Sequence, residues 1–577
     1  MHVRRLTPNR GTLPHMVHSR IASALISLAC FAGPLVPACA PAQSVGDADA
    51  SDAAADASTD DIATDTTTCT PGWIEPFQPS PRARFPAGFL WGSATAPYQI
   101  EGGLGGTDWA EWERRGRVVR GERADDGPRS FQFVDDDVRI LRESEQNAYR
   151  VGVEWARVFP TRAAWDRCRN APVATRASEC TAAASVEGLA YYHRVLSLLR
   201  AANITAMVTL QHFSLPAYID DLSQDWHTQA WMRPTIVQDL AIWAEFAARE
   251  FGGDVDWWIT LNEPFIVMPA GYLYGVHPPG RTAEFSSLAA LGLTMIRAHV
   301  AMFDAIHAND TTVAVTSGPL MPARAANVSI AHHVRAFFPH NCVSRADRAS
   351  ADRLEGLLNR LFFDAIVRGN VDLDLSGTIE AGEPMNDPAY RGRADYLGVN
   401  YYSLTDVQSN NAIPVLRGIP LPDSLDRGLP KTDFGWDIYP RGFVQVLNWA
   451  GTYGLPVVVT ENGLADAAGV NRPRFIAEHL AAVAVAIQAG VRVLGYFHWS
   501  LLDNFEWAAG YCPRFGLYRT DYTSPMRTRT AGPGVDVYRS IIRAGEVTDA
   551  LLQAQPMYRT PATFCASAPS ILGDAGM

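Results

Sequence analysis

The sequence is almost free of lysine and has no basic stripe. Lys431 is the only lysine among 577 residues, and acidic side chains outnumber basic ones, which gives a formal net charge of -12. A protein that binds nucleic acid needs a positively charged surface to neutralise phosphates. The composition therefore argues against nucleic acid as a partner and favours a neutral or cationic small molecule.

Patterns that bind metals or nucleotides are also missing. None of the eight cysteines lies in a Cys-x-x-Cys pair or in a His/Cys cluster with ligand spacing, so we expect no structural zinc. The segment from Gly92 to Ala96, after the first predicted strand, lacks the glycine spacing that cradles a dinucleotide. We expect a protein that needs no metal and no organic cofactor.

The N-terminus has no apolar run that is long enough for a stable membrane span. Four arginines within the first 20 residues precede an apolar stretch over residues 21–36 that is short and interrupted. This pattern predicts an export signal over residues 1–44, with the mature protein in the periplasm or at the cell surface. The residues up to Cys39 resemble a bacterial lipobox, so Cys39 is the expected site of lipidation, with Cys30 as the alternative.

Residues 45–70 have hardly any large apolar side chains and many aspartates. Such a segment cannot bury enough surface to fold, which predicts a solvated linker between the export signal and a folded domain over residues 71–567. A lipid at Cys39 would be the only attachment to a membrane.

Six cysteines follow the signal, and an even number in an exported chain suggests disulfides, with fifteen connectivities open. Cys168 and Cys180 are close in sequence and form the first expected pair. Cys69 and Cys565 bracket the domain, where termini often lie close together, and form the second. Cys342 with Cys512 would be the third.

From residue 85 onward, apolar runs rich in β-formers alternate with segments of helical period. The predicted strands are 89–95, 149–155, 204–212, 257–262, 312–316, 396–401, 457–461 and 493–499. The predicted helices include 188–202, 234–251, 288–308, 351–368, 442–453 and 473–489. Hydrophobic strands that alternate with amphipathic helices indicate a parallel sheet covered by helices, and eight such units predict a (β/α)₈ TIM barrel.

Two glutamates end predicted strands. Glu263 follows the fourth strand in Thr-Leu-Asn-Glu-Pro, and Glu461 follows the seventh in Thr-Glu-Asn-Gly. Catalytic groups of barrel enzymes lie at the carboxyl ends of the strands, and strands four and seven face each other across the barrel mouth. Two carboxyl groups placed so could flank one glycosidic bond.

With these motifs the sequence resembles glycoside hydrolase family 1, the β-glucosidase family, over about residues 85–522. The blocks that carry the resemblance are residues 85–92, 98–102, 149–150, 209–213, 262–264, 398–402, 435–440, 460–463 and 499–507. The resemblance implies that Glu263 is the general acid/base and Glu461 the nucleophile. It also implies that Arg150 and Tyr402 hold the nucleophile.

By the same resemblance, a group of polar and aromatic side chains binds the sugar. Its members are Gln99, His212, Asn262, Asn400, Trp499, Glu506 and Trp507. A carboxylate at Glu506 would repel a sugar 6-phosphate, which disfavours the phospho-β-glycosidase branch. Phe213 and Trp155 stand in settings that depart from the family pattern, which leaves the aglycone preference open.

The expected activity is that of a retaining exo-β-glycosidase, first of all a β-glucosidase that also accepts galactosyl or fucosyl residues. Its partners would be small β-glycosides or oligosaccharides. Two alternatives stay open: a transglycosidase that uses the same site, and a catalytically silent sugar-binding protein at the cell surface. The sequence leaves the oligomeric state open.

Overall fold

The computed structural model describes residues 72–74, 76–314, 323–421, 423, 425–561 and 564–565. Contacts divide the chain into Met1–Cys69 and Thr70–Met577, and the described residues belong to the second unit. The predicted export signal over residues 1–44, the linker over 45–70 and Cys39 lie outside the described residues.

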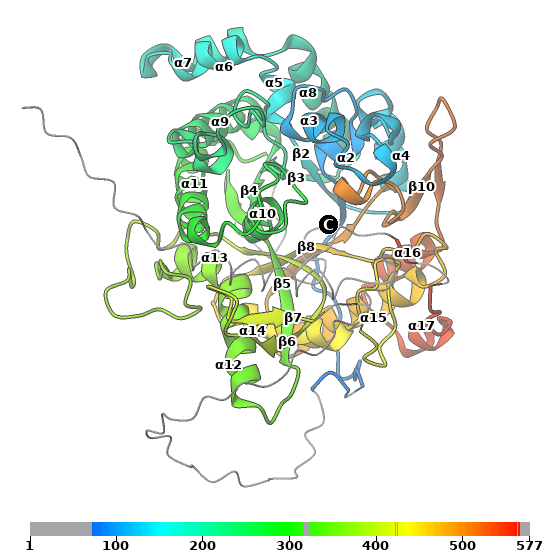
Figure 1. Cartoon of the computed structure of the whole chain (residues 1–577). Coiled ribbons are helices and arrows are strands. Elements are labelled where there is room, and N and C mark those ends of the chain that lie inside the picture. The colour runs from blue at the N-terminus through cyan, green and yellow to red at the C-terminus, as the bar shows by residue number, and fades with distance from the viewer. Residues whose placement is uncertain are drawn as a thin grey trace, which may run out of the picture. The chain divides into compact units, whose positions relative to one another are not determined.

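The second unit is built around a closed barrel of eight parallel strands (Figure 1). The barrel strands are β1 (Leu90–Ala94), β2 (Ala148–Gly152), β3 (Thr205–Gln211), β4 (Trp257–Asn262), β5 (Asn327–Pro339), β6 (Leu397–Ser409), β8 (Val457–Gly463) and β9 (Val493–Trp499). Pairing of β1 with β9 and of β5 with β6 closes the ring. A short strand, β7 (Gly418–Pro420), adds to β6 in antiparallel fashion, and β10 (Tyr518–Thr520) pairs with β11 (Arg529–Ala531). The predicted TIM barrel is confirmed.

Helices cover the outside of the barrel (Figure 1). The longer ones are α4 (Ser130–Glu143), α7 (Val173–Ala183), α8 (Val186–Ala201), α9 (Ile236–Phe251), α11 (Leu288–Asn309), α12 (Arg345–Glu355), α14 (Pro440–Gly451), α15 (Arg472–Gln488) and α16 (Gly534–Ala544). Shorter ones are α2 (Pro97–Ile100), α3 (Asp108–Arg114), α5 (Trp155–Val158), α6 (Arg162–Arg169), α10 (Pro264–Tyr272), α13 (Leu361–Phe363) and α17 (Asp549–Ala554). Two π-helical turns, η7 (Gly356–Arg360) and η8 (Asp364–Arg368), flank α13.

The predicted fifth strand is wrong. Residues 311–314 are not in a strand, and the exposed Val313 packs into no sheet. The fifth barrel strand is β5, which carries His332, His333 and Arg335 among its buried residues. These polar side chains interrupt the apolar pattern that marks a buried strand in sequence. The other seven predicted strands coincide with barrel strands within a few residues, except that β6 continues to Ser409.

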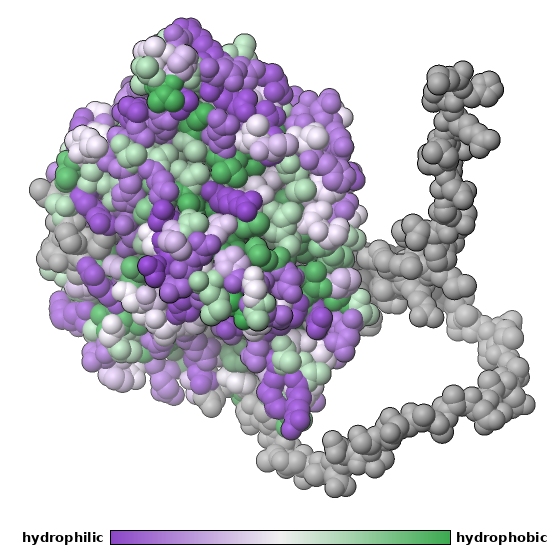
Figure 2. All heavy atoms as spheres, turned by 90° about the vertical axis from the view of Figure 1, so that its left-hand side faces the viewer, coloured by the Kyte–Doolittle hydropathy of each residue, from purple (hydrophilic) through white to green (hydrophobic). Residues whose placement is uncertain are grey.

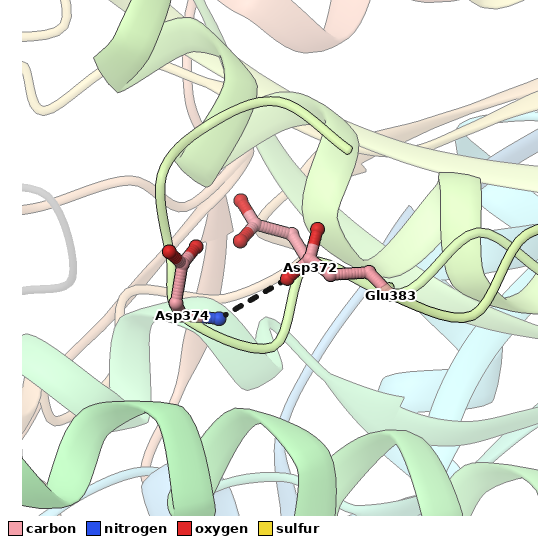
Figure 3. A group of neighbouring side chains, drawn as sticks. All are labelled: Asp372, Asp374 and Glu383. Carbon is pink, nitrogen blue, oxygen red and sulfur yellow. Dashed lines mark hydrogen bonds between the residues drawn. The ribbon is translucent and has the colours of Figure 1, made fainter. Parts of the chain in front are cut away.

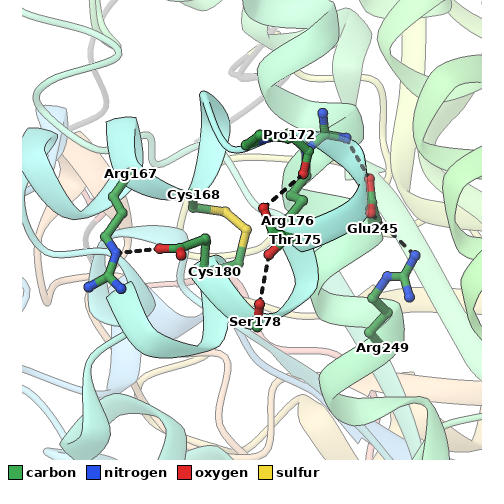
Figure 4. The surroundings of a disulfide bond; sticks show 10 residues. Arg167, Cys168, Pro172, Thr175, Arg176, Ser178, Cys180, Glu245 and Arg249 are labelled. Atoms are coloured by element: carbon green, nitrogen blue, oxygen red, sulfur yellow. Dashed lines mark hydrogen bonds and ion pairs between the residues drawn. A yellow bond between two sulfur atoms is a disulfide. The ribbon is translucent and has the colours of Figure 1, made fainter.

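The expected disulfide between Cys168 and Cys180 is present and joins α6 to α7. Figure 4 shows this helical pair beside α9, where Arg176 of α7 forms an ion pair with Glu245. The pair lies in an insertion between β2 and α8, so the crosslink stabilises an addition to the barrel.

The second and third predicted disulfides are wrong. Cys512 pairs with Cys565, with their Cα atoms 5.7 Å apart. This bond excludes both the predicted pair of Cys69 with Cys565 and the predicted pair of Cys342 with Cys512. Cys342 is also disulfide-bonded. The C-terminal segment returns to the loops at the barrel mouth, where the Cys565 N–H donates to the Asp433 carbonyl. This return places Cys565 beside Cys512 and could not be read from sequence distance.

Polar and apolar residues are intermixed on the surface of the domain. Figure 2 shows hydrophilic residues over most of one face, with hydrophobic residues scattered between them. Among the residues that the structure describes, one helical stretch, Phe285–Asn309, is long and apolar enough to cross a membrane by length and composition. Half of its most apolar window is buried, and α11 packs against α9, as expected for a core helix of a globular fold.

Candidate active site

A cavity with about 380 Å³ of empty space opens at the carboxyl ends of the strands. Its lining consists of His212, Phe213, Asn262, Glu263, His333, Tyr402, Trp436, Glu461, Trp499, Glu506, Trp507 and Phe515. Aromatic and polar side chains share this lining, as in sites that bind small polar ligands. Both glutamates singled out in the sequence therefore belong to one cavity.

Glu461 lies near the end of β8, a strand whose residues are all buried. Arg150 of β2 donates from Nη1 to Glu461 Oε1 at 2.5 Å. Tyr402 donates its hydroxyl to the other oxygen, Oε2, at 2.7 Å. The two bonds fix both carboxylate oxygens and favour the ionised form. The predicted contacts of Arg150 and Tyr402 with Glu461 are present.

Glu263 follows β4 and precedes Pro264, the first residue of α10. Its backbone is left-handed, with φ at 46° and ψ at 55°. A non-glycine residue is strained in this region, and such strain occurs often at functional sites. Its side chain accepts from Asn400 Nδ2 at 2.8 Å, and Oε1 lies 3.3 Å from His333 Nδ1.

Asn262 connects the surroundings of the two glutamates. Its Oδ1 accepts from Arg150 Nη2 at 2.7 Å and from Asn400 Nδ2 at 3.2 Å. Its Nδ2 lies 2.9 Å from His212 Nε2. A continuous chain of hydrogen bonds thus runs from Glu461 through Arg150, Asn262 and Asn400 to Glu263, and it holds side chains of four strands in one arrangement.

The two carboxyl groups differ in their pKa. Burial raises the pKa of Glu461 to about 7, although Arg150 opposes the rise and Glu263 adds to it. Burial also pushes the pKa of Glu263 upward, but His333 and Asn400 outweigh burial and hold it below its usual value. The roles implied by the family resemblance call for the reverse order, because a general acid needs the raised pKa. The difference arises from His333, whose positive charge would keep Glu263 ionised.

The sugar-binding residues predicted from sequence cluster around the same cavity. The ring centroid of His212 lies 5.8 Å from that of Trp499 and 6.0 Å from that of Trp507, and both pairs are stacked. Gln99 lies behind the lining and donates from Nε2 to Glu506 Oε2 at 3.3 Å. Burial, followed by the charge of Glu461, raises the pKa of Glu506 to about 8.

The comparison with protein families agrees with this geometry. The sequence profile described as glycosyl hydrolase family 1 matches residues 81–547, which is most of the chain and spans the whole barrel.

The chain belongs to glycosyl hydrolase family 1.

This family 1 glycosidase also matches related proteins and their solved structures over most of its length. A β-galactosidase of Pyrococcus woesei is 31% identical over 513 residues, covering 80% of this chain and 98% of the relative. β-Glucosidase A of Thermotoga maritima is 31% identical over 467 residues, covering 77% and 95%. A β-glycosidase structure from Pyrococcus horikoshii has a TM-score of 0.68 at 27% identity, covering 83% of this chain and 99% of that one. The chain is a glycoside hydrolase, so the alternative of a catalytically silent sugar-binding protein is set aside.

One solved structure carries a sugar-like ligand. The β-glucosidase of Thermotoga maritima in complex with glucoimidazole has a TM-score of 0.66 at 28% identity. The match covers 80% of this chain and 99% of that one.

Four residues that line the cavity of this family 1 glycosidase escaped the sequence prediction: Phe213, His333, Trp436 and Phe515. His333 lies on the strand that was misplaced, so its position at the cavity was hidden. Phe213 was noticed only as a departure from the family pattern. Trp436 lies in residues 435–440, one of the blocks that carry the family resemblance, and this block could have indicated its place at the cavity.

Several buried polar atoms at or behind the cavity wall have no hydrogen-bond partner among the described residues. They include Gln99 Oε1, His212 Nδ1, His333 Nε2 and Trp436 Nε1. Buried polar groups without partners are costly, so a ligand rich in hydroxyl groups would be favoured here. No group of three potential metal ligands close enough to share an ion was found in this cavity among the described residues.

Proposed function

We propose that this family 1 glycosidase is a retaining exo-β-glycosidase. It removes terminal non-reducing β-D-glucosyl residues by double displacement, and it also accepts galactosyl or fucosyl residues. The observation that carries the proposal is the cavity that holds both carboxyl groups, with Glu461 bound by Arg150 and Tyr402. The names of the relatives, β-galactosidase and β-glucosidase, support the range of sugars.

In the first step, the Glu461 carboxylate attacks the anomeric carbon while Glu263 gives its proton to the leaving oxygen. The glycosidic C–O bond breaks as the ester to Glu461 forms. Arg150 and Tyr402 orient the attacking carboxylate. This step needs a proton on Glu263, which burial favours and which His333, Asn400 and Arg150 oppose.

In the second step, the ionised Glu263 takes a proton from water, and the oxygen of that water attacks the anomeric carbon. The ester breaks, the sugar leaves in the β configuration, and Glu461 is again a carboxylate. Asn400 donates to Glu263, which supports its ionised form in this step.

Sugar recognition would combine aromatic and polar groups around the cavity. Trp499 and Trp507 offer flat apolar surfaces, and the partnerless atoms of Gln99 and His212 can bond hydroxyl groups. With a pKa of about 8, Glu506 is protonated at neutral pH in the free site and can donate a hydrogen bond. Repulsion of a sugar 6-phosphate by Glu506 would then become strong only as the pH rises through about 8.

The stereochemistry of the first product tests the proposal. NMR during hydrolysis of an aryl β-glucoside by the wild type should detect the β anomer of glucose first. Glu461→Ala should lose activity by about 10⁴-fold or more. Azide should then restore turnover and yield the α-glycosyl azide, because azide attacks from the side that the carboxylate has left.

A matched control is Glu478→Ala on α15, a partly buried glutamate that does not line the cavity. It should retain turnover. An α-anomeric first product, or an undiminished rate in Glu461→Ala, would refute the assignment of Glu461.

We also propose that the chain is exported and lipid-anchored at Cys39. The disulfide bonds of Cys168 with Cys180 and of Cys512 with Cys565 support export, because such bonds persist in oxidising compartments. Mass spectrometry of the mature N-terminus from the membrane fraction should find a diacylglyceryl cysteine at position 39. A mature protein that starts elsewhere, or that stays in the membrane fraction after Cys39→Ala, would contradict the anchor.

A further inference from the structure

A loop outside the catalytic cavity gathers three carboxylates. Asp372, Asp374 and Glu383 lie between η8 and β6, and one oxygen from each lies within 4.8 Å of the others (Figure 3). Calcium binds oxygen ligands at 2.3–2.6 Å, so two ligands on opposite sides of one ion are about 5 Å apart. The spacing of the three oxygens is therefore compatible with one shared cation.

The sequence of this loop independently indicates a calcium ligand set. Residues 372–383 read Asp-Leu-Asp-Leu-Ser-Gly-Thr-Ile-Glu-Ala-Gly-Glu. Counted from Asp372, oxygen-bearing side chains occupy positions 1, 3, 5, 7, 9 and 12, and glycine occupies position 6. This is the ligand spacing of the twelve-residue EF-hand loop, in which position 7 contributes its carbonyl and glycine at position 6 allows the sharp turn. Here position 5 is Ser376, whose hydroxyl oxygen can also bind a cation.

The cluster has no direct ion pair, although the charge of Arg353 acts on Asp372 and Asp374. Asp372 is only 8% exposed, and none of the three carboxylates forms an ion pair with a side chain among the described residues. The nearby Arg353 donates instead to the carbonyls of Val415 and Leu375. Buried carboxylates in proteins are normally paired with a cation or bound to a metal. A bound cation would supply the direct partner that Asp372 lacks.

Backbone N–H groups hold the carboxylates in place. Asp372 accepts from Ser376 and Gly377, and Glu383 accepts from Leu373 at 2.6 Å. Glu383 Oε1 also accepts from Asp374, whereas Glu383 Oε2 and each oxygen of Asp372 accept a single N–H. A carboxylate oxygen has two lone pairs, so the oxygens with a single N–H retain acceptor capacity for an ion. At Gly377, where φ is 83°, an added Cβ would lie 2.7 Å from the Arg353 carbonyl. Only glycine fits at position 6.

We propose that residues 372–383 bind one Ca²⁺ ion. The ligands would be Asp372, Asp374, Ser376, Glu383 and the carbonyl of Thr378. Ca²⁺ is favoured over Mg²⁺ because a loop of this kind supplies six or more oxygens, whereas Mg²⁺ requires a tight octahedron and retains its waters. The role is structural: no residue of the loop lines the catalytic cavity, and the ion would crosslink the segment that leads into β6.

Calcium binding can be measured without any activity assay. Protein stripped with EDTA and dialysed should bind one Ca²⁺ per chain in isothermal titration, with a dissociation constant of about 1 mM or tighter. Mg²⁺ should bind more weakly. The thermal midpoint should rise with the Ca²⁺ concentration, because the ion binds the folded state. Absence of bound Ca²⁺ at several millimolar, measured by titration and by atomic emission, would overturn the proposal.

Two variants assign the ligands. Glu383→Gln and Asp374→Asn should each weaken Ca²⁺ binding by about tenfold or more, since each removes a charged ligand. Asp521→Asn is the matched control, because Asp521 is exposed and likewise accepts backbone N–H groups within its own turn. It should bind Ca²⁺ like the wild type. Unchanged affinity in both loop variants, or an equal loss in the control, would refute this ligand set.

Discussion

Glu506 offers a test of how strongly the cavity perturbs a carboxyl group. Burial raises the pKa of Glu506 to about 8 from an ordinary value of 4.5. Between these two pH values the folded protein keeps a proton on Glu506 that the unfolded chain has lost. The free energy of unfolding therefore falls as the pH rises. Stability of the wild type should therefore fall between pH 4.5 and about 8. Glu506→Gln should lack this contribution, because an amide has no proton to lose.

The magnitude follows from the shift. A difference of about 3.5 pKa units at about 1.4 kcal/mol per unit gives a ceiling of about 5 kcal/mol. Unfolding entropy for a domain of this size is on the order of 1 kcal/mol per degree, so the ceiling corresponds to about 5 °C in the thermal midpoint. Glutamine resembles the protonated acid in shape, so the variant and the wild type should be similar near pH 4.5.

The assay is scanning calorimetry of both proteins from pH 4.5 to 9. The midpoint of Glu506→Gln should exceed that of the wild type by an amount that grows with pH and levels off above about 8. Glu187→Gln, at an exposed position, should show no such trend. A difference that stays constant over the whole range would refute the proposed burial of a protonated carboxyl group.

Three further predictions concern the neighbours of the site and the insertion. His333→Asn should move the acidic limb of the kcat/KM profile to higher pH, because His333 lowers the pKa of Glu263, whereas the basic limb follows Glu461, whose pKa is about 7. His227→Asn, at an exposed position that does not line the cavity, should leave both limbs in place. Tyr402→Phe should lower kcat by about 10- to 100-fold, because the lost hydrogen bond to the charged Glu461 is worth about 1.5–3 kcal/mol. An unchanged kcat would show that Tyr402 has no part in the mechanism. Replacing Cys168 and Cys180 by serine should lower the free energy of unfolding by about 3 kcal/mol, because the bond closes a loop with a sequence separation of 12. Denaturant unfolding measures this loss, and kcat should stay unchanged. Equal stability would show that the bond does not constrain the unfolded chain.

The barrel could be predicted where a strand is apolar until its last residues. β4 and β8 are of this kind: every residue is buried, and polar groups appear only where the chain reaches the barrel mouth. β5 could not be predicted, because His332, His333 and Arg335 are buried in a polar interior that a hydrophobic pattern does not reveal. The same reason hid His333, the group that sets the pKa of Glu263.

The sequence by itself determined the fold class, the family and the pair of glutamates, because these depend on local patterns and on blocks that keep their order along the chain. Only the tertiary structure decided which cysteines pair and which glutamate has the raised pKa. Both depend on groups far apart in sequence. Cys565 meets Cys512 because the C-terminal segment folds back, and the pKa of Glu461 is set by burial together with charges from β2 and β4. Charge and burial are properties of the assembled cavity, so no single segment of the chain encodes them.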